Sequence, residues 1–216
     1  MLILKSLGQF AIIVDGEVHR SRKDQRRVVF FLYLALNEEP VLREDLARFL
    51  WPHAEESLQQ SSLRTWLYRL RKDGYTPYLK ITRQEIGLAP DAPFRCDLVE
   101  LRNLLSEPDA LDLDDLRKAN ELYRGPFLAD MNLDNWIEAA EWADTIQYGL
   151  EIKMVLVWSS LIDRLLAQGM VAEALRVSER LINLAPYDDA CRLLYLRSVA
   201  AAMRPEEALR RLNAYR

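Results

Sequence analysis

The sequence is short of the residues on which several kinds of functional site depend. Its 216 residues include only two histidines, two cysteines and seven glycines. His19 and His53 have no Cys, Asp or Glu at the spacing of metal ligands, so we expect no metal site. Neither G-x-x-x-x-G-K nor G-x-G-x-x-G occurs, which excludes the common phosphate-binding loops. A nucleophile elbow and a Cys–His signature are also missing, and we therefore expect neither an enzyme nor a cofactor.

Long apolar runs are missing as well. No run approaches the ~18 residues of a transmembrane helix, so we expect no contact with a membrane. The N-terminus, MLILKSLGQF, lacks the basic region and the long apolar region of a secretory signal. Cys96 and Cys191 lie far apart, and we expect them to be buried free thiols in a reducing cytoplasm. Scarce glycine and proline with abundant leucine and alanine favour a mainly helical fold.

The charge of the chain is unevenly distributed. The net charge of −4 does not suggest a nucleic-acid-binding protein. Residues 1–92, however, contain 14 Lys and Arg against 12 Asp and Glu, whereas residues 93–216 contain 15 against 21. Between residues 57 and 83 there are six cations and a single acid, Asp73. A local positive field in an acidic chain is typical of a small module that reads DNA.

The segment SLQQSSLRTWLYRLRK, residues 57–72, predicts a helix with two different faces. Leu63, Trp66, Leu67 and Leu70 follow the spacing of a core-facing stripe. The other arc combines hydroxyls, a tyrosine and four cations without an acid: Ser61, Ser62, Arg64, Thr65, Tyr68, Arg69, Arg71 and Lys72. Such a face suits the DNA major groove, where Arg and Lys meet phosphates and guanine edges. For this helix taken alone, a solvated basic face is the alternative.

The elements around this helix follow the order of a winged helix-turn-helix. Residues 2–20 alternate around Asp15-Gly16, which predicts a hairpin in a small antiparallel sheet. Three helices are expected next, over residues 24–37, 43–51 and 57–72. Ser57 and Gln60 match a capping box, which places the start of the third helix at Ser57. Gly74 is expected to end it.

A second hairpin follows the basic helix. Its strands are expected over residues 79–82 and 86–88, with Lys80 on the first strand and Arg83 at the tip. In a winged helix-turn-helix the third helix enters the major groove and the hairpin, or wing, reaches an adjacent groove. The basic helix therefore occupies the position of a recognition helix, and Arg83 occupies the tip of the wing.

The second part of the chain predicts helices only. A proline-rich stretch, residues 89–93, separates it from the first part, which gives domains at residues 1–92 and 93–216. Helices are expected over residues 98–105, 113–123 and 135–168. The sequence EALR at residues 173–176 returns at residues 207–210, and this spacing of about 34 residues is the tetratricopeptide period. Trp158, Gly169 and Pro186 are in phase with that repeat.

The two parts together resemble bacterial transcription activators of the antibiotic-regulatory (SARP) type. The resemblance is carried by Leu7-Gly8-Gln9-Phe10, Asp15-Gly16, Gln25-Arg26, Arg43-Glu44-Asp45-Leu46, Leu50-Trp51, Leu63 to Lys72, Ile81-Thr82-Arg83, Asp97-Leu98, Leu122 to Leu128 and Trp136. It covers nearly the whole chain, and it is specific through the order and spacing of these motifs. The family joins an OmpR-like winged helix to a bacterial transcriptional activator domain of tetratricopeptide-like helices.

The resemblance implies a role for individual residues. Arg64, Thr65 and Arg69 correspond to positions of the family that face bases. Ser62, Trp66, Tyr68 and Arg71 correspond to positions that meet the DNA backbone, although Trp66 replaces a usual His and Thr65 a usual Val. With Ser61 and Lys72 from the same arc, and with Lys80 and Arg83 from the wing, these residues form the expected DNA-binding site. The helix that starts at Arg43 has Leu42 in place of a Ser or Thr N-cap.

The expected function is sequence-specific binding of promoter DNA by a cytoplasmic transcription regulator, in the role of an activator. The helical domain would then serve dimerisation, a small-molecule effector or a partner such as RNA polymerase. One alternative is a protein-interaction scaffold whose winged helix is degenerate. Another is a small-molecule sensor that uses the concave face of the helical repeats. Salt-dependent DNA binding separates the regulator from both alternatives, because only phosphate contacts release counterions.

Overall fold

The structure is a computed structural model, and it describes residues 1–202 apart from residues 38, 108–109 and 134–135. The chain forms two compact units. The first comprises residues 1–103 and 123–146, and the second comprises residues 104–122 and 147–216. The domain division expected at residues 92 and 93 stays a prediction.

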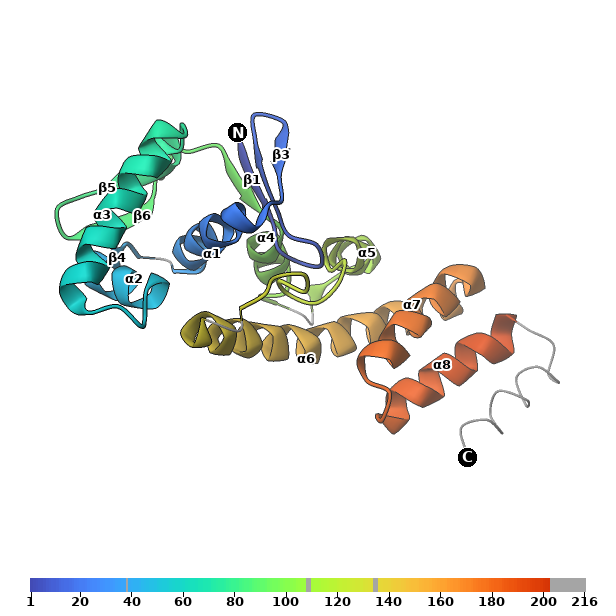
Figure 1. Ribbon diagram of the computed structural model, residues 1–216. Coiled ribbons are helices and arrows are strands. Elements are labelled where there is room, and N and C mark those ends of the chain that lie inside the picture. Colours follow the sequence, from blue (N-terminus) through green and yellow to red (C-terminus); the bar gives the residue numbers. More distant parts are fainter. Residues whose placement is uncertain (38, 108–109, 134–135, 203–216) are drawn as a thin grey trace. The chain divides into compact units, whose positions relative to one another are not determined.

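The first unit begins with a four-stranded sheet (Figure 1), in the order β3-β2-β1-β7. Its strands are β1 (Leu2–Lys5), β2 (Ala11–Val14), β3 (Glu17–His19) and β7 (Phe94–Cys96). Asp15 and Gly16 have φ angles of 50° and 94°, the left-handed conformation that a tight hairpin turn needs, so the predicted hairpin is confirmed. The sheet is not wholly antiparallel, because β7 pairs with β1 in parallel and places Leu2 opposite Phe94.

Three helices follow as predicted, to within two residues at each end. They are α1 (Arg22–Leu36), α2 (Arg43–Leu50) and α3 (Glu56–Lys72). The apolar run Val28–Leu32 is helical and fully buried in the core. Each helix thus contributes one apolar face to a common core. The opposite face of α3 therefore points to solvent.

At the ends of the helices, two predictions are confirmed and one is wrong. The capping box expected at Ser57 is wrong, because α3 begins earlier and Glu55 is its N-cap, with φ −61° and ψ 151°. Ser57 already lies within the helix and has no free end to cap. Gly74 follows α3 with a φ of 85°, and the Tyr75 amide donates to the Leu70 carbonyl, so the predicted stop is confirmed. Leu42 is the N-cap of α2, as expected.

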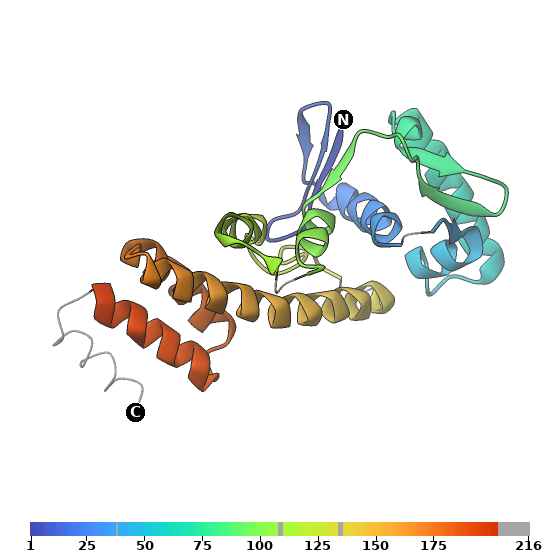
Figure 2. The same ribbon diagram turned by 180° about the vertical axis from the view of Figure 1, so that it is seen from behind.

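The wing belongs to a second, three-stranded sheet in the order β4-β6-β5. Its strands are β4 (Val41–Leu42), β5 (Leu79–Ile81) and β6 (Glu85–Leu88), and the short 3₁₀ helix η1 (Thr76–Tyr78) leads into β5. Figure 2 shows β5 and β6 as a hairpin beside α3. The predicted wing is confirmed, and β4, which ties it to the start of α2, was not predicted.

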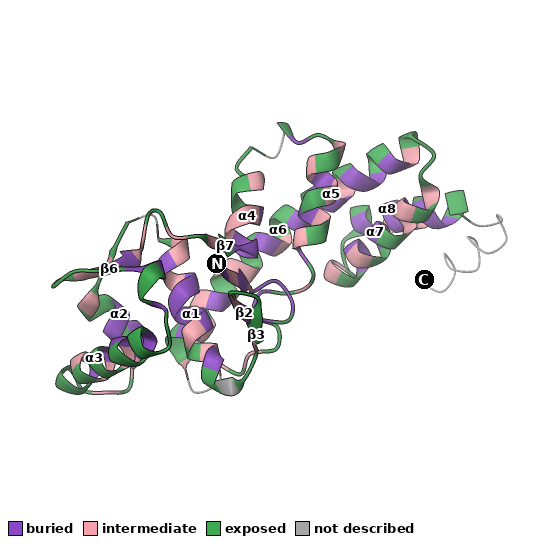
Figure 3. Cartoon of the chain, turned by 90° about the horizontal axis from the view of Figure 1, so that it is seen from above, coloured by how far each residue is buried: buried purple, intermediate pink, exposed green. Residues whose placement is uncertain are grey.

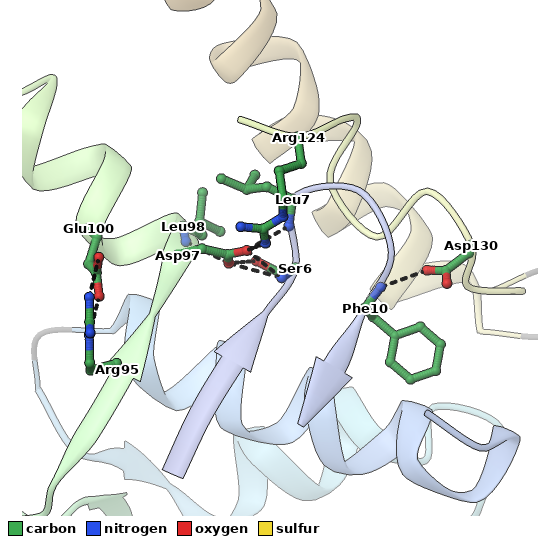
Figure 4. A network of polar contacts seen from close by, with 9 residues as sticks. All are labelled: Ser6, Leu7, Phe10, Arg95, Asp97, Leu98, Glu100, Arg124 and Asp130. Carbon is green, nitrogen blue, oxygen red and sulfur yellow. Dashed lines mark hydrogen bonds and ion pairs between the residues drawn. The ribbon is translucent and has the colours of Figure 1, made fainter. Parts of the chain in front are cut away.

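A buried carboxylate joins the N-terminal sheet to the chain that follows the wing (Figure 4). Asp97 accepts hydrogen bonds from the amide and hydroxyl of Ser6 at 2.8–2.9 Å and from the Leu7 amide at 3.2 Å. Arg124 forms an ion pair with the same carboxylate. Nearby, Gly8 and Gly125 approach so closely that a Cβ at Gly125 would lie 3.2 Å from the Gly8 Cα. The motifs Leu7 to Phe10 and Leu122 to Leu128 therefore meet in space.

The secondary structure described for the second unit consists of helices. The remaining helices of the chain are α4 (Asp97–Leu104), α5 (Leu113–Leu122), α6 (Ile137–Ala167), α7 (Val171–Leu184) and α8 (Asp189–Ala202). Asp163 on α6 and Arg197 on α8, which are 34 residues apart, form an ion pair at 2.9 Å. Equivalent positions of successive helix pairs thus lie side by side, as the tetratricopeptide period predicts.

The marker residues of the repeat occupy the positions expected for them. Trp158 is buried, and its indole nitrogen donates to Asn120 Oδ1 at 2.9 Å. Gly169 has a φ of 73° in the turn between α6 and α7. The second EALR sequence, residues 207–210, lies outside the described residues. No helix in the described part of the chain combines the length and hydropathy that crossing a membrane requires.

Both cysteines are buried and free, as predicted. Burial raises the pKa of Cys96 to about 12 and that of Cys191 to about 11. Since only the thiolate is nucleophilic, we expect both to resist iodoacetamide at pH 8 in the folded protein and to react quickly in urea. Mass spectrometry of the labelled chain measures this. Rapid labelling of Cys96 without urea would contradict its burial.

Candidate nucleic-acid interface

The outer face of α3 carries the cationic arc that the sequence predicts. Its core-facing side is buried through Leu63, Leu67 and Leu70. Figure 3 shows the alternation of buried and exposed residues along this helix. The exposed residues include most of the predicted site: Ser61, Arg64, Thr65, Tyr68, Arg69, Arg71 and Lys72. Tyr68, the aromatic residue of this face, is 68% exposed.

The cations of this face have no acidic partners among the residues that the structure describes. The nearest acid in sequence, Asp73, is bound by Arg27 of α1 at 2.6 Å and is not available to α3. Within the described residues no ion pair engages the six cations of the helix and wing, namely Arg64, Arg69, Arg71, Lys72, Lys80 and Arg83. Their charge is therefore directed at solvent, where it attracts an anionic polymer.

A hollow of about 250 Å³ lies between α3 and the wing. It is lined by Arg43, Arg64, Leu67, Tyr68, Arg71 and Ile81. Arg43 was not among the predicted site residues, because the sequence shows it only as the first residue of α2. Its backbone amide donates to the Gln84 carbonyl at 2.8 Å, which brings the guanidinium beside the wing. Three guanidinium groups thus surround one hollow, an arrangement suited to phosphate groups.

The tip of the wing is held by the Thr82 side chain. Its hydroxyl accepts hydrogen bonds from the amides of Gln84 and Glu85, at 3.3 and 2.9 Å. Arg83 lies in this turn and is exposed, and Lys80 is exposed on β5. Because the turn is braced by its own hydrogen bonds, the Arg83 side chain projects from a defined position.

Two hydroxyl groups of α3, unlike its cations, already have a hydrogen-bond partner. Thr65 donates to the Ser61 carbonyl and Ser61 donates to the Leu58 carbonyl, both at 3.0 Å. A phosphate oxygen accepts hydrogen bonds, so each hydroxyl would have to break its hydrogen bond to the helix carbonyl before it could donate to a phosphate. The cations therefore dominate the chemistry of this face.

Trp66 and Ser62 lie at the edge of the exposed arc, and both are half-buried. The Trp66 ring packs against Trp51 with centroids 6.5 Å apart. Its Nε1 is buried and has no hydrogen-bond partner among the described residues. The predicted contact of Trp66 with the DNA backbone stays a prediction, since the nitrogen that would make it does not face solvent in this conformation.

Residues 100–216 match the family model of the bacterial transcriptional activator domain, and this match spans more than half of the chain. The chain belongs to the bacterial transcriptional activator domain family. The resemblance to SARP-type activators is thereby confirmed, and the family is one of transcriptional regulators, which are generally not enzymes. No curated protein matches the chain.

The fold of this family member is similar to that of Mycobacterium tuberculosis EmbR, solved in complex with a low affinity phosphopeptide. The TM-score is 0.69 at 20% sequence identity, and the match covers 99% of this chain but 58% of the EmbR chain. At this identity the similarity concerns the fold. It confirms a mainly helical protein with small sheets, in which a winged helix-turn-helix precedes a tetratricopeptide-like domain.

Proposed function

We propose that this protein is a transcription regulator that binds specific DNA sequences, with α3 in the major groove and the β5–β6 wing in an adjacent groove. The observation that carries the proposal is the set of six cations on α3 and the wing without acidic partners in the described residues. Membership in a family of transcriptional regulators supports it. Arg64, Thr65 and Arg69 would face bases, while Ser61, Ser62, Tyr68, Arg71, Lys72 and Lys80 would meet phosphates.

The helical domain would supply the contacts that organise regulation. On α6, Tyr148, Ile152 and Leu156 are exposed by 68, 50 and 58% and follow one another at four-residue spacing. This apolar stripe supports self-association, which would place two winged helices on paired half-sites about one helical turn apart. Sedimentation equilibrium measures that association. RNA polymerase and a small effector are the further partners proposed for this domain.

The direct test is a selection of genomic fragments with the purified chain, followed by fluorescence anisotropy on the selected site. A regulator that neutralises several phosphates loses affinity steeply with salt, with a slope of about −0.9 per phosphate contact in a double-logarithmic plot. Binding of the selected site should also exceed that of random DNA by about a thousandfold or more. A chain that selects no sequence would instead support the scaffold alternative.

For the wing, we expect Arg83→Ala to weaken DNA binding with little change in the base preference of the major groove. An arginine at the tip of a hairpin suits a narrow, electronegative minor groove, where it contributes mostly charge. The salt slope should fall by about one unit because one phosphate-neutralising cation is lost. Equal affinity and an equal salt slope for the variant and the native protein would show that the wing does not touch DNA.

A further inference from the structure

One arginine of the first unit, Arg26, lies close to two indole rings. The Arg26 guanidinium carbon lies over Trp51 and Trp136, at 5.3 and 5.4 Å from the ring centroids. Trp136 is itself fixed, because its Nε1 donates to the Phe49 carbonyl at 2.7 Å. Burial lowers the pKa of Arg26. The guanidinium therefore lies close to the aromatic surface of two rings, one of which is itself held in place.

The hydrogen-bond donors of Arg26 are nonetheless unused. Among the described residues it makes no side-chain hydrogen bond and no ion pair. The residue is only partly covered, so solvent still reaches it although the nearby rings desolvate the guanidinium. The adjacent Arg27 provides the contrast, since it binds Asp24, Asp73 and the Tyr75 hydroxyl. A guanidinium carries five N–H donors, and one that packs against aromatic rings can still use the donors along its edge.

A pocket of about 310 Å³ opens at this arginine. It is lined by Arg26, Leu50, Trp51, Pro52, His53, Ala54 and Trp136. Its walls are mostly apolar, and Arg26 and His53 supply its polar groups. Volume and lining are those of a small-molecule site, in which apolar walls hold the body of a ligand and a few polar groups orient it.

We propose that this pocket binds a small organic carboxylate, with its carboxylate on Arg26 and its apolar body against Trp51, Pro52 and Trp136. The planar fork of a guanidinium matches the two oxygens of a carboxylate. The apolar walls favour an anion with a hydrophobic body over a fully hydrated inorganic anion. Pro52 to Ala54 connect α2 to α3, so an occupied pocket fixes the segment that positions the start of the recognition helix.

This site does not depend on DNA binding, and it can be tested on the full chain without DNA. The chain has five tryptophans, so a ¹H–¹⁵N spectrum shows five indole signals at most, which Trp51→Phe and Trp136→Phe assign. Benzoate is the probe, benzyl alcohol is its neutral counterpart, and inorganic phosphate is the anion without an apolar body. We expect benzoate to shift the Trp51 and Trp136 signals saturably, and benzyl alcohol to do so much more weakly.

The deciding variant is Arg26→Gln, which keeps most of the side chain but removes the charge. We expect its Kd for benzoate to rise about tenfold or more, since hydrogen bonds to a charged group contribute that much. Arg102→Gln on α4 is the matched control and should bind like the native protein. Unchanged melting temperature and an unchanged Trp66 signal verify that Arg26→Gln is folded.

Three results would overturn the proposal. The first is benzoate binding that Arg26→Gln leaves unchanged. The second is equal binding of benzyl alcohol, which would make the pocket merely apolar. The third is a response to inorganic phosphate but not to benzoate, which would assign Arg26 to a phosphate, such as one from the DNA backbone.

Discussion

Replacing Asp97 with alanine should lower the free energy of unfolding of the first unit by about 3–5 kcal/mol. The carboxylate is buried, at 7% exposure, and accepts from the amides of Ser6 and Leu7, both of which are fully buried. Alanine would leave these donors without an acceptor, and each buried unsatisfied donor costs about 1–3 kcal/mol. Urea unfolding, followed by tryptophan fluorescence, measures the loss as a shift of the midpoint at constant slope.

Two further variants make the Asp97 experiment specific. Asp97→Asn keeps one carbonyl oxygen for the Ser6 amide and should cost less than alanine. Asp91→Ala removes an exposed carboxylate and should change stability by about 0.5 kcal/mol or less. If Asp97→Ala unfolds at the same urea concentration as Asp91→Ala, the Asp97 network does not stabilise the unit.

Replacing Arg69 or Arg64 with alanine should weaken binding of the selected DNA site by about 1–3 kcal/mol and relax the preference at one base pair. Both side chains are exposed on the outer face of α3, and neither has an acidic partner in the described part of the chain. An arginine that hydrogen-bonds to a guanine edge stabilises only the complex with the correct base pair. The affinity of either variant for random DNA should therefore fall less than its affinity for the selected site.

Anisotropy against the selected site and its single-base variants measures that effect. Arg102→Ala removes a cation from α4 and should leave both affinity and base preference unchanged. If Arg64→Ala and Arg69→Ala bind every sequence as the native protein does, α3 does not read bases. A uniform loss over all sequences would instead assign these arginines to phosphates.

The helices of the first unit could be predicted because their signals are local. Leu63, Leu67 and Leu70 repeat at helical spacing, and the structure buries all three. The same spacing predicts the cations on the opposite face, and the structure exposes them there. For the helix alone a solvated basic face was the alternative, and it was the order of the flanking elements that favoured a DNA-binding site. The error at Ser57 has a physical cause. Several polar residues in this stretch are suitable N-caps, and the path of the chain after Pro52 brings Glu55, rather than Ser57, to the N-cap position of α3.

The parts that could not be predicted depend on contacts between distant segments. β7 has only three residues, Phe94–Cys96, and its partner β1 lies some ninety residues earlier, so no local pattern indicates the pairing. In the sequence Asp97 is only part of a motif. Its role as a hydrogen-bond acceptor can be seen only in the structure, where Ser6 lies beside it. Arg43 was missed for a similar reason, since its position near the wing depends on β4 pairing with β6.

The parallel pairing of β1 with β7 has a consequence for the order in which the chain can fold during synthesis. The first strand leaves the ribosome early, but its neighbour Phe94–Cys96 follows only after the whole winged helix has been made. Phe10 must wait longer still, because its amide donates to Asp130 at 2.9 Å. Contacts of such long sequence separation form slowly. The nascent N-terminal strand therefore has one unpaired edge until residues 94–96 have emerged, and a chaperone that shields this edge would raise the yield of folded protein.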